Sequence, residues 1–280
     1  KDKNDINFGI DNQGDFIAAS FVRTAADILE IRRILEEQDA DIDIIAKIES
    51  QEGIDNLDDI IQVTDGVMVA RGDMGVEIPA EDVPLVQKQI IEKCNRVGKI
   101  VIIATQMLDS MIINPRPTRA EVSDVANAIF DGADAIMLSG ETAAGKYPVE
   151  VVKTMARIAK RAEEVLPFEE MLRQKRLEGT FTVTDAISYA TCATAANLGV
   201  SGIITATFTG NTARMVAKYR PRANIVAATP VEKILRKLSL VWGVHPILIS
   251  RTEGTDEVFE ESIKGALQTE YIKNGDLIVL

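Results

Sequence analysis

Strand-like and helix-like segments alternate along most of this chain. Five short apolar runs are each followed by a helical pattern, as expected for strands that are covered on both faces. Strands that alternate with helices form right-handed βαβ units and a parallel sheet. Five such units fit part of a closed (β/α)8 barrel or an open doubly wound sheet. The runs occupy residues 15–21, 42–49, 65–73, 99–107 and 133–142.

Two of the intervening helices begin at capping signals. Thr24 with Asp27, and Thr118 with Glu121, have the spacing of a capping box, in which a hydroxyl and a carboxylate satisfy free amides of the first turn. Gly132 lies just beyond the last apolar residue of the second helix, where glycine commonly ends a helix. These signals predict helices that start directly after Thr24 and Thr118.

A polar stretch without strand signals divides the chain. We expect a first domain over residues 1–168, a linker over 169–181, and a second, smaller open α/β domain over 182–280. The second domain resumes the alternation with different spacing. Its strands are predicted at residues 202–208, 224–229, 245–250 and 276–280, with helices over 184–198 and after Asn211, Pro230 and Thr255.

Composition and charge exclude several classes of protein. The net charge of −12 argues against nonspecific nucleic-acid binding, because a polyanion would be repelled. No apolar run is long enough to span a bilayer, and no signal peptide is visible. Cys94 lies on the apolar stripe of a predicted helix, and the two cysteines match no metal spacing, so we expect reduced thiols and a cytoplasmic protein. Because the chain begins at Lys1 rather than methionine, we also expect a fragment or a processed chain.

Polar residues stand at the ends of consecutive predicted strands. Residues two apart in a strand point the same way, so Lys47 and Glu49 should share one face, and Arg71 and Asp73 another. Thr105 ends the next strand. Ligands bind at the carboxyl ends of strands both in barrels and in open α/β sheets. This edge of the sheet is therefore the predicted functional site.

The residue types at this edge indicate phosphoryl chemistry. Glu49 and Asp73, from neighbouring strands, offer hard oxygen ligands to Mg²⁺ or Mn²⁺. Lys47 would lie close to that cation, which is reasonable only if an anion such as a phosphoryl group sits between them. Glycines at positions 72 and 75 would let the backbone approach a ligand and leave amide N–H groups free to bind it. The alternative is a simple salt bridge at a barrel mouth followed by a solvated turn.

Four long motifs resemble the pyruvate kinase family. They are KIES, VARGDMGVEIPAEDVPLVQK, ATQMLDSM and NPRPTRAEVSDVANAIFDGADAIMLSGETAAGKYPVE, and the resemblance continues through TDAI and MVAKYRPRA in the second domain. It implies a partial (β/α)8 TIM barrel, with the last five βα units, followed by a regulatory α/β domain. The first three barrel strands, the lid domain and the K⁺ ligands of the family are absent from this chain. We therefore expect the 280 residues alone to be inactive.

The resemblance also implies a reaction and a role for each residue of the site. Pyruvate kinases transfer the phosphoryl group of phosphoenolpyruvate to ADP, giving pyruvate and ATP in glycolysis. Lys47 would stabilise the transferring phosphoryl group, and Glu49 and Asp73 would bind Mg²⁺ or Mn²⁺. The backbone of Gly72 and Asp73 would meet the substrate carboxylate, and Thr105 would lie beside the enolate. The family also implies a K⁺ requirement and a homotetramer.

Three further segments have candidate roles, and two of them have two interpretations each. Ser139 and Glu141 would line the barrel mouth and relay a proton, or form a cap and turn. Arg116 and Arg119 are expected to be loop and cap residues near a subunit interface. A hydroxyl-rich loop in the second domain would bind the phosphate of a sugar-phosphate effector or an inorganic anion, or only cap a helix. Its residues are Thr207, Thr209, Gly210, Asn211 and Thr212.

Two other classes of function fit the residues without the resemblance. A metal-dependent lyase or aldolase acting on an oxoacid enolate would also pair a glutamate with an aspartate at strand ends. A noncatalytic sugar-phosphate-binding module would bind no metal at Glu49 and Asp73. The lysine two residues before Glu49, suited to a phosphoryl group, favours the kinase.

Overall fold

The computed structural model describes residues 2–177, 182–252 and 254–280 and divides the chain into two compact units. The first unit extends to Leu166 and the second begins at Pro167. Helix α10 (Phe168–Leu177) occupies most of the segment that was expected to be a linker over 169–181. Residues 178–181 of that segment lie outside the described residues, so the linker and the exact domain limits stay a prediction. None of the helices in the described part of the chain has the length and apolar character needed to cross a bilayer.

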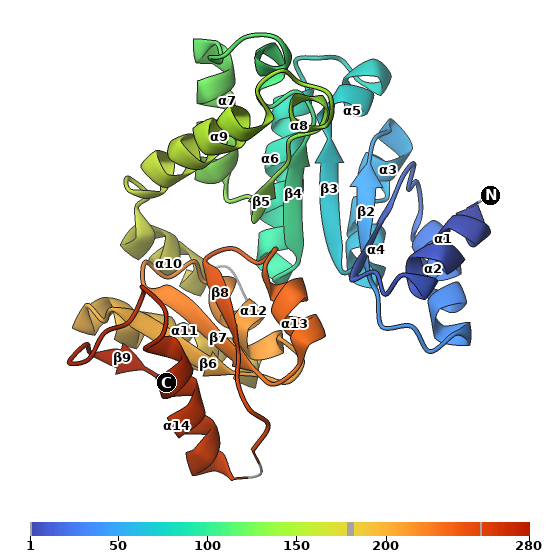
Figure 1. Ribbon diagram of the computed structural model, residues 1–280. Coiled ribbons are helices and arrows are strands. Elements are labelled where there is room, and N and C mark those ends of the chain that lie inside the picture. The colour runs from blue at the N-terminus through green and yellow to red at the C-terminus, as the bar shows by residue number, and fades with distance from the viewer. Residues whose placement is uncertain (1, 178–181, 253) are drawn as a thin grey trace. The chain divides into compact units, whose positions relative to one another are not determined.

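The first unit is built on a parallel sheet whose five strands lie in chain order (Figure 1). This order is that of consecutive strands in a barrel, whereas a doubly wound sheet reverses its strand order at a switch point. The strands are β1 (Phe16–Ala19), β2 (Asp43–Ile48), β3 (Gly66–Ala70), β4 (Ile100–Ala104) and β5 (Ala135–Ile136). The helical segments are α1 (Asp2–Asp11), α2 (Ala25–Glu37), α3 (Gln51–Asp55), α4 (Leu57–Val63), α5 (Arg71–Glu77), α6 (Val83–Val97), η1 (Asp109–Ile112), α7 (Arg119–Asp131), α8 (Gly140–Ala143) and α9 (Pro148–Glu163).

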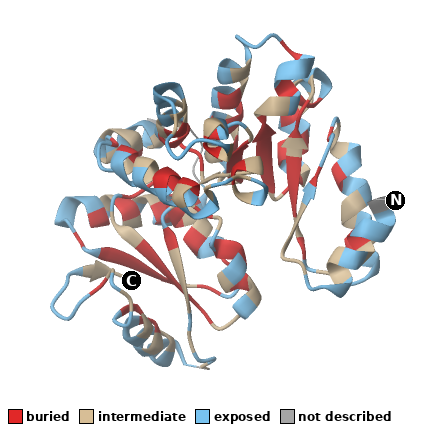
Figure 2. Cartoon of the chain, turned by 45° about the horizontal axis from the view of Figure 1, so that its top comes forward, coloured by how far each residue is buried: buried red, intermediate tan, exposed pale blue. Residues whose placement is uncertain are grey.

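The continuous apolar runs exist because the central strands are buried on both faces. Every residue of β3 and of β4 is buried (Figure 2). Helix α6 packs on both strands and buries Ile90, Ile91 and Cys94. Cys94 is buried and free, as expected for a core cysteine, and burial raises the pKa of its thiol well above its usual range.

Both predicted capping boxes form. In α2 the Asp27 carboxylate accepts the Thr24 N–H at 2.8 Å. In α7 the Glu121 N–H donates to the Thr118 hydroxyl at 3.2 Å, and the Glu121 carboxylate accepts the Thr118 N–H at 2.7 Å. Gly132 ends α7 with a φ of 98°, in the left-handed region that favours glycine. The helix boundaries in these places follow from sequence signals alone.

The strand predicted over residues 65–73 is too long. The run over 65–73 is a strand only to Ala70, and Arg71–Glu77 forms helix α5. Arg71 and Asp73 therefore do not alternate along a strand face, and that prediction was wrong. Pairing with β4 ends at the Ala70–Ala104 pair. The chain then forms helical hydrogen bonds, and at the end of α5 the Ile78 N–H donates to the Met74 carbonyl at 3.0 Å.

The second unit contains a smaller parallel sheet with the strand order β8-β7-β6-β9. The order confirms an open α/β fold, because β9 lies on the far side of β6 from β7. The point of reversal lies between β6 and β9, where ligands bind at the carboxyl ends of strands in sheets of this kind. Its strands and remaining helices are β6 (Gly202–Ala206), β7 (Asn224–Thr229), β8 (Val244–Leu248), β9 (Ile278–Val279), α11 (Val183–Leu198), α12 (Asn211–Ala217), α13 (Glu232–Leu238) and α14 (Thr255–Ala266).

Candidate active site

The carboxyl ends of β2, β3 and β4 lie at one edge of the first sheet. The register pairs Ile48 of β2 with Val69 of β3, and Ala70 of β3 with Ala104 of β4. The residues that follow these pairs leave the sheet at the same edge. Topology thus brings the strand-end residues singled out in the sequence to a common edge of the sheet.

An ion pair stands at the end of β2. The Lys47 ammonium lies 2.6 Å from Glu49 Oε1, and it also donates to the Ser20 hydroxyl at 3.1 Å. Glu49 is only 2% exposed, and its Oε2 accepts the backbone N–H of Phe21 at 2.6 Å. Phe21 has a positive φ of 56°, so the chain after β1 is bent back toward this carboxylate. The segment after β1 thus contributes to the site, although no sequence pattern indicated it.

Asp73 has a different environment from Glu49. Its carboxylate lies exposed in the first turn of α5 and has no hydrogen-bond or ion-pair partner among the described residues. Within the described ranges, no cluster of three or more histidine, cysteine, aspartate or glutamate side chains could hold a metal ion. A divalent ion that is held by one or two carboxylates completes its shell with water or substrate oxygens, as Mg²⁺ commonly does.

The hydroxyl of Thr105 joins the ends of β3 and β4. Thr105 Oγ1 accepts the N–H of Gly72 at 2.8 Å and donates to the carbonyl of Ala104 at 2.6 Å. The Gly72 amide is therefore engaged by the threonine hydroxyl, and its binding of a ligand stays a prediction. A ligand oxygen that binds this amide would have to take the place of the threonine hydroxyl.

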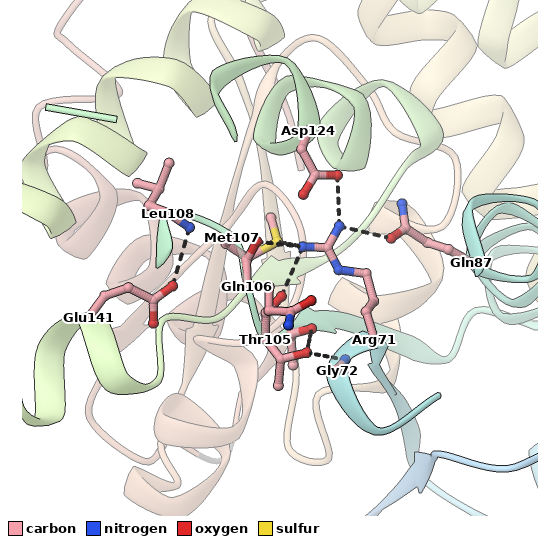
Figure 3. Close-up of polar contacts among 10 residues, drawn as sticks. Arg71, Gly72, Gln87, Thr105, Gln106, Met107, Leu108, Asp124 and Glu141 are labelled. Carbon is pink, nitrogen blue, oxygen red and sulfur yellow. Dashed lines mark hydrogen bonds and ion pairs between the residues drawn. The ribbon is translucent and has the colours of Figure 1, made fainter. Parts of the chain in front are cut away.

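Arg71 makes contacts that the sequence pattern did not reveal. Its guanidinium lies among groups from α6, α7 and the turn after β4, and its side chain is 10% exposed (Figure 3). Asp124 Oδ1 lies 2.7 Å from Nη1, and the carbonyl of Thr105 lies 2.9 Å from Nη2. These partners are 34 to 53 positions away along the chain, so no local spacing could have indicated them.

Ser139 and Glu141 lie at the start of α8. Glu141 is 2% exposed, and one of its oxygens accepts the N–H of Leu108 at 3.2 Å (Figure 3). The other oxygen accepts the N–H of Ser139 at 2.7 Å. These bonds tie α8 to the segment after β4, which favours a structural role for the carboxylate. Arg116 and Arg119 are both exposed, and Arg119 is the first residue of α7.

The hydroxyl-rich loop of the second unit follows β6, at the point where its sheet reverses strand order. The Gly210 N–H donates to the buried Thr207 hydroxyl at 2.9 Å, and the Asn211 N–H donates to the Thr209 hydroxyl at 3.4 Å. Thr212 is exposed in the first turn of α12. The hydroxyls thus cap the helix, and binding of a phosphate here stays a prediction.

Comparison with known proteins connects both units to one family. A family model described as the barrel domain of pyruvate kinase matches residues 1–152, and one described as its alpha/beta domain matches residues 185–280. The pyruvate kinase of Bacillus licheniformis is 59% identical over the whole chain, and that of Geobacillus stearothermophilus is 58% identical. The pyruvate kinase of Clostridium acetobutylicum is 56% identical over the whole chain. The chain covers 48%, 48% and 59% of these three relatives, respectively, or about half their length.

These comparisons confirm the predicted fold class. The five-stranded sheet belongs to the part of the chain matched by a barrel domain, and the four-stranded sheet belongs to the part matched by an alpha/beta domain. The strands of the first sheet lie in chain order, as the strands of a barrel do, so the structure agrees with the match to a barrel domain.

Proposed function

This chain belongs to the pyruvate kinase family, and we propose that the complete protein transfers the phosphoryl group of phosphoenolpyruvate to ADP, giving pyruvate and ATP. The observation that supports this most directly is the Lys47–Glu49 ion pair at the carboxyl end of β2. A buried carboxylate with an ammonium group at 2.6 Å, at the ligand-binding edge of a barrel-type sheet, suits chemistry on an anionic phosphoryl group.

We propose that Glu49 and Asp73 hold Mg²⁺ or Mn²⁺. Both carboxylates supply the hard oxygen atoms that these cations prefer, and Asp73 is exposed and without a protein partner among the described residues. One or two carboxylates are the usual protein contribution to a magnesium site that also binds phosphate. When bound, the cation would neutralise charge on the phosphoryl oxygens.

Lys47 is proposed to bind the transferring phosphoryl group. An ammonium group has three N–H donors, and the Ser20 hydroxyl and Glu49 account for two of them. The third donor is available to a phosphoryl oxygen, and the side chain is 22% exposed, so a ligand can reach it. Phosphoryl transfer depends mainly on positioning and charge neutralisation, which such a contact supplies.

Gly72, Asp73 and Thr105 are proposed to bind and orient the organic part of the substrate. The Gly72 N–H, now bonded to the Thr105 hydroxyl, would donate to a carboxylate oxygen of the substrate in its place. The displaced hydroxyl would then be free to hold or move a proton at the adjacent enolate. The two residues thus form a pair whose mutual bond is exchanged for bonds to the substrate.

The remaining parts of the proposal depend on membership of the family. They are a requirement for K⁺, a homotetramer, a cytoplasmic location and regulation by a sugar phosphate at Thr207, Thr209, Gly210, Asn211 and Thr212. The last of these has the support that the loop lies at the point of strand-order reversal in the second sheet.

Replacement of Lys47 tests the proposed reaction. In the complete protein, Lys47→Met removes the phosphoryl contact and leaves Glu49 buried without its cation, and we expect a loss of about 3–4 kcal/mol of transition-state stabilisation. This corresponds to a fall in kcat of about a hundredfold to a thousandfold. Pyruvate formation from phosphoenolpyruvate and ADP, coupled to NADH oxidation by a lactate dehydrogenase, measures it.

The matched control is Lys88→Met, which removes a 70% exposed lysine that pairs with Asp131 at 3.3 Å on the surface. We expect this variant to keep wild-type turnover. A Lys47→Met enzyme with near-normal kcat would contradict the proposed role. Pyruvate release from a substrate without any nucleotide would instead support the lyase or aldolase alternative.

A further inference from the structure

The turn that follows β4 has a strained backbone. Thr105 and Gln106 are consecutive non-glycine residues with φ of 68° and 54°. The left-handed region is unfavourable for a β-branched residue such as threonine, and such residues persist there only when their surroundings hold them. Thr105 is also the residue whose hydroxyl contacts the Gly72 amide. The position of that hydroxyl therefore depends on whatever keeps the turn in this conformation.

Arg71 makes the contacts that hold the turn. Its Nη2 donates to the carbonyl of Thr105 at 2.9 Å and to the carbonyl of Gln106 at 3.3 Å, and it lies 2.8 Å from the sulfur of Met107 (Figure 3). One nitrogen thus contacts three consecutive residues, including both that have a positive φ.

The other side of the same guanidinium is anchored to helices. Nη1 donates to Asp124 Oδ1 of α7 at 2.7 Å and to Gln87 Oε1 of α6 at 3.4 Å. Asp124 neutralises the charge of a side chain that is only 10% exposed. A planar fork can contact the turn on one side and the helices on the other at once, whereas an ammonium group is a single point charge.

We propose that Arg71 is a positioning residue for the reaction. It holds the turn after β4 in the conformation in which the Thr105 hydroxyl accepts the Gly72 N–H. The inference rests on the proposed function, in which these two groups meet the substrate. Arg71 acts through Thr105 and Gly72, and its Nη1 and Nη2 donors are directed at protein groups. It is a separate contribution from the charge of Lys47.

Hydrogen exchange provides a test that does not require turnover. Gly72 lies in the first turn of α5, where a backbone N–H has no partner within its own helix, so its protection depends on the Thr105 hydroxyl. In the complete protein, we expect Arg71→Lys to speed exchange of the Gly72 amide. Unchanged exchange in a folded Arg71→Lys protein would overturn the proposal.

Kinetics then test whether the effect passes through Thr105. We expect Arg71→Lys to lower kcat by about tenfold to a hundredfold, as a small misplacement of an active-site group does, with a smaller change in KM for phosphoenolpyruvate. In a Thr105→Ala background, Arg71→Lys should have little further effect, because residues that act as a unit are not additive. Full additivity of the two substitutions would overturn the proposal.

Arg32 provides a matched control at the amino end of strand β3 in the same sheet. Its Nη2 donates to the carbonyl of Val63 at 2.9 Å and pairs with Asp65 at 2.8 Å, so it also joins a carbonyl and a carboxylate. Arg32→Lys should lower stability to a similar extent and leave kcat unchanged. A fall in kcat equal to that of Arg71→Lys would show a merely structural effect and overturn the proposal.

The activities of the Lys47→Met and Arg71→Lys proteins distinguish the role of Arg71 from the proposed function. If Lys47→Met keeps wild-type turnover, the proposed function fails. If Lys47→Met is inactive and Arg71→Lys resembles the wild type, only the role of Arg71 is overturned. Far-UV circular dichroism of each variant establishes that the fold is kept.

Discussion

The two carboxylates proposed for the metal differ in how the chain holds them. Glu49 is 2% exposed and has both oxygens engaged, by Lys47 and by the Phe21 amide. Asp73 is exposed and without a protein partner among the described residues. A buried carboxylate whose position is fixed and an exposed one that can move would let the site adjust as a cation and its substrate arrive together.

Titration with Mn²⁺ tests the assignment of both ligands. We expect Glu49→Gln and Asp73→Asn each to weaken Mn²⁺ binding by at least about tenfold, since even outer-shell partners of a metal contribute that much. Electron paramagnetic resonance of free Mn²⁺ measures the affinity. The control is Asp58→Asn, which removes a 74% exposed carboxylate paired with Lys93 in the same unit. Equal affinities in all four proteins would favour the noncatalytic sugar-phosphate-binding alternative.

Sequence reasoning located part of this site because topology determines it. Lys47, Glu49 and Thr105 stand at strand ends, and the carboxyl ends of parallel strands meet at one edge whatever the side chains do. The contacts of Arg71 could not be predicted in this way. They depend on one rotamer and on a turn with positive φ at Thr105, and neither leaves a periodic signal in the sequence.

At the scale of elements, helix starts were predictable and strand ends were not. A capping box is a local pattern of two side chains, and those of α2 and α7 form as expected. The last predicted strand of the first unit covered residues 133–142, but β5 is only Ala135–Ile136. The Met137 N–H still donates to the Ile103 carbonyl at 2.9 Å, and α8 begins at Gly140, where Glu141 accepts the Ser139 N–H. Periodicity alone does not mark such a turn.

A third capping box gives the second unit a pH-dependent contribution to stability. At the start of α11, Asp185 bonds to Thr182 and to the ammonium of Lys218, which lies 2.7 Å from Oδ1. Burial would raise the pKa of Asp185, but the hydrogen bonds and the charge of Lys218 together lower it to about 2. A carboxylate whose pKa is lower in the folded state stabilises that state above its ordinary pKa, and the contribution is lost as the pH falls.

We therefore expect the second unit to lose stability between about pH 5 and pH 2, on the order of 1 kcal/mol of it through Asp185. Asp185→Asn should remove that part of the pH dependence. Urea unfolding followed by the fluorescence of Trp242, the only tryptophan, reports on this unit. Asp256→Asn, an exposed aspartate in the first turn of α14, is the control and should keep the wild-type slope. An Asp185→Asn protein with an unaltered slope would contradict this origin.

At the scale of the whole molecule, the first sheet has two open edges in the described part of the chain. β1 and β5 each pair with one neighbour only. A barrel has no edge, because its strands close on themselves and place their carboxyl ends around one mouth. In an open five-stranded sheet the ring of ligand-binding loops is incomplete, and unpaired backbone groups at the two edges favour association with other chains.

These edges predict how the 280 residues behave when produced alone. We expect pyruvate formation no faster than that of the same chain carrying Lys47→Met, because Lys47, Glu49 and Asp73 would stand at an open rim that water enters freely. We also expect fast amide exchange along the outer side of β1 and β5, and concentration-dependent association in analytical ultracentrifugation. The positive control is a full-length relative assayed under identical conditions. Turnover by the isolated chain at the rate of that relative, as a monomer, would show that five strands suffice to assemble the site.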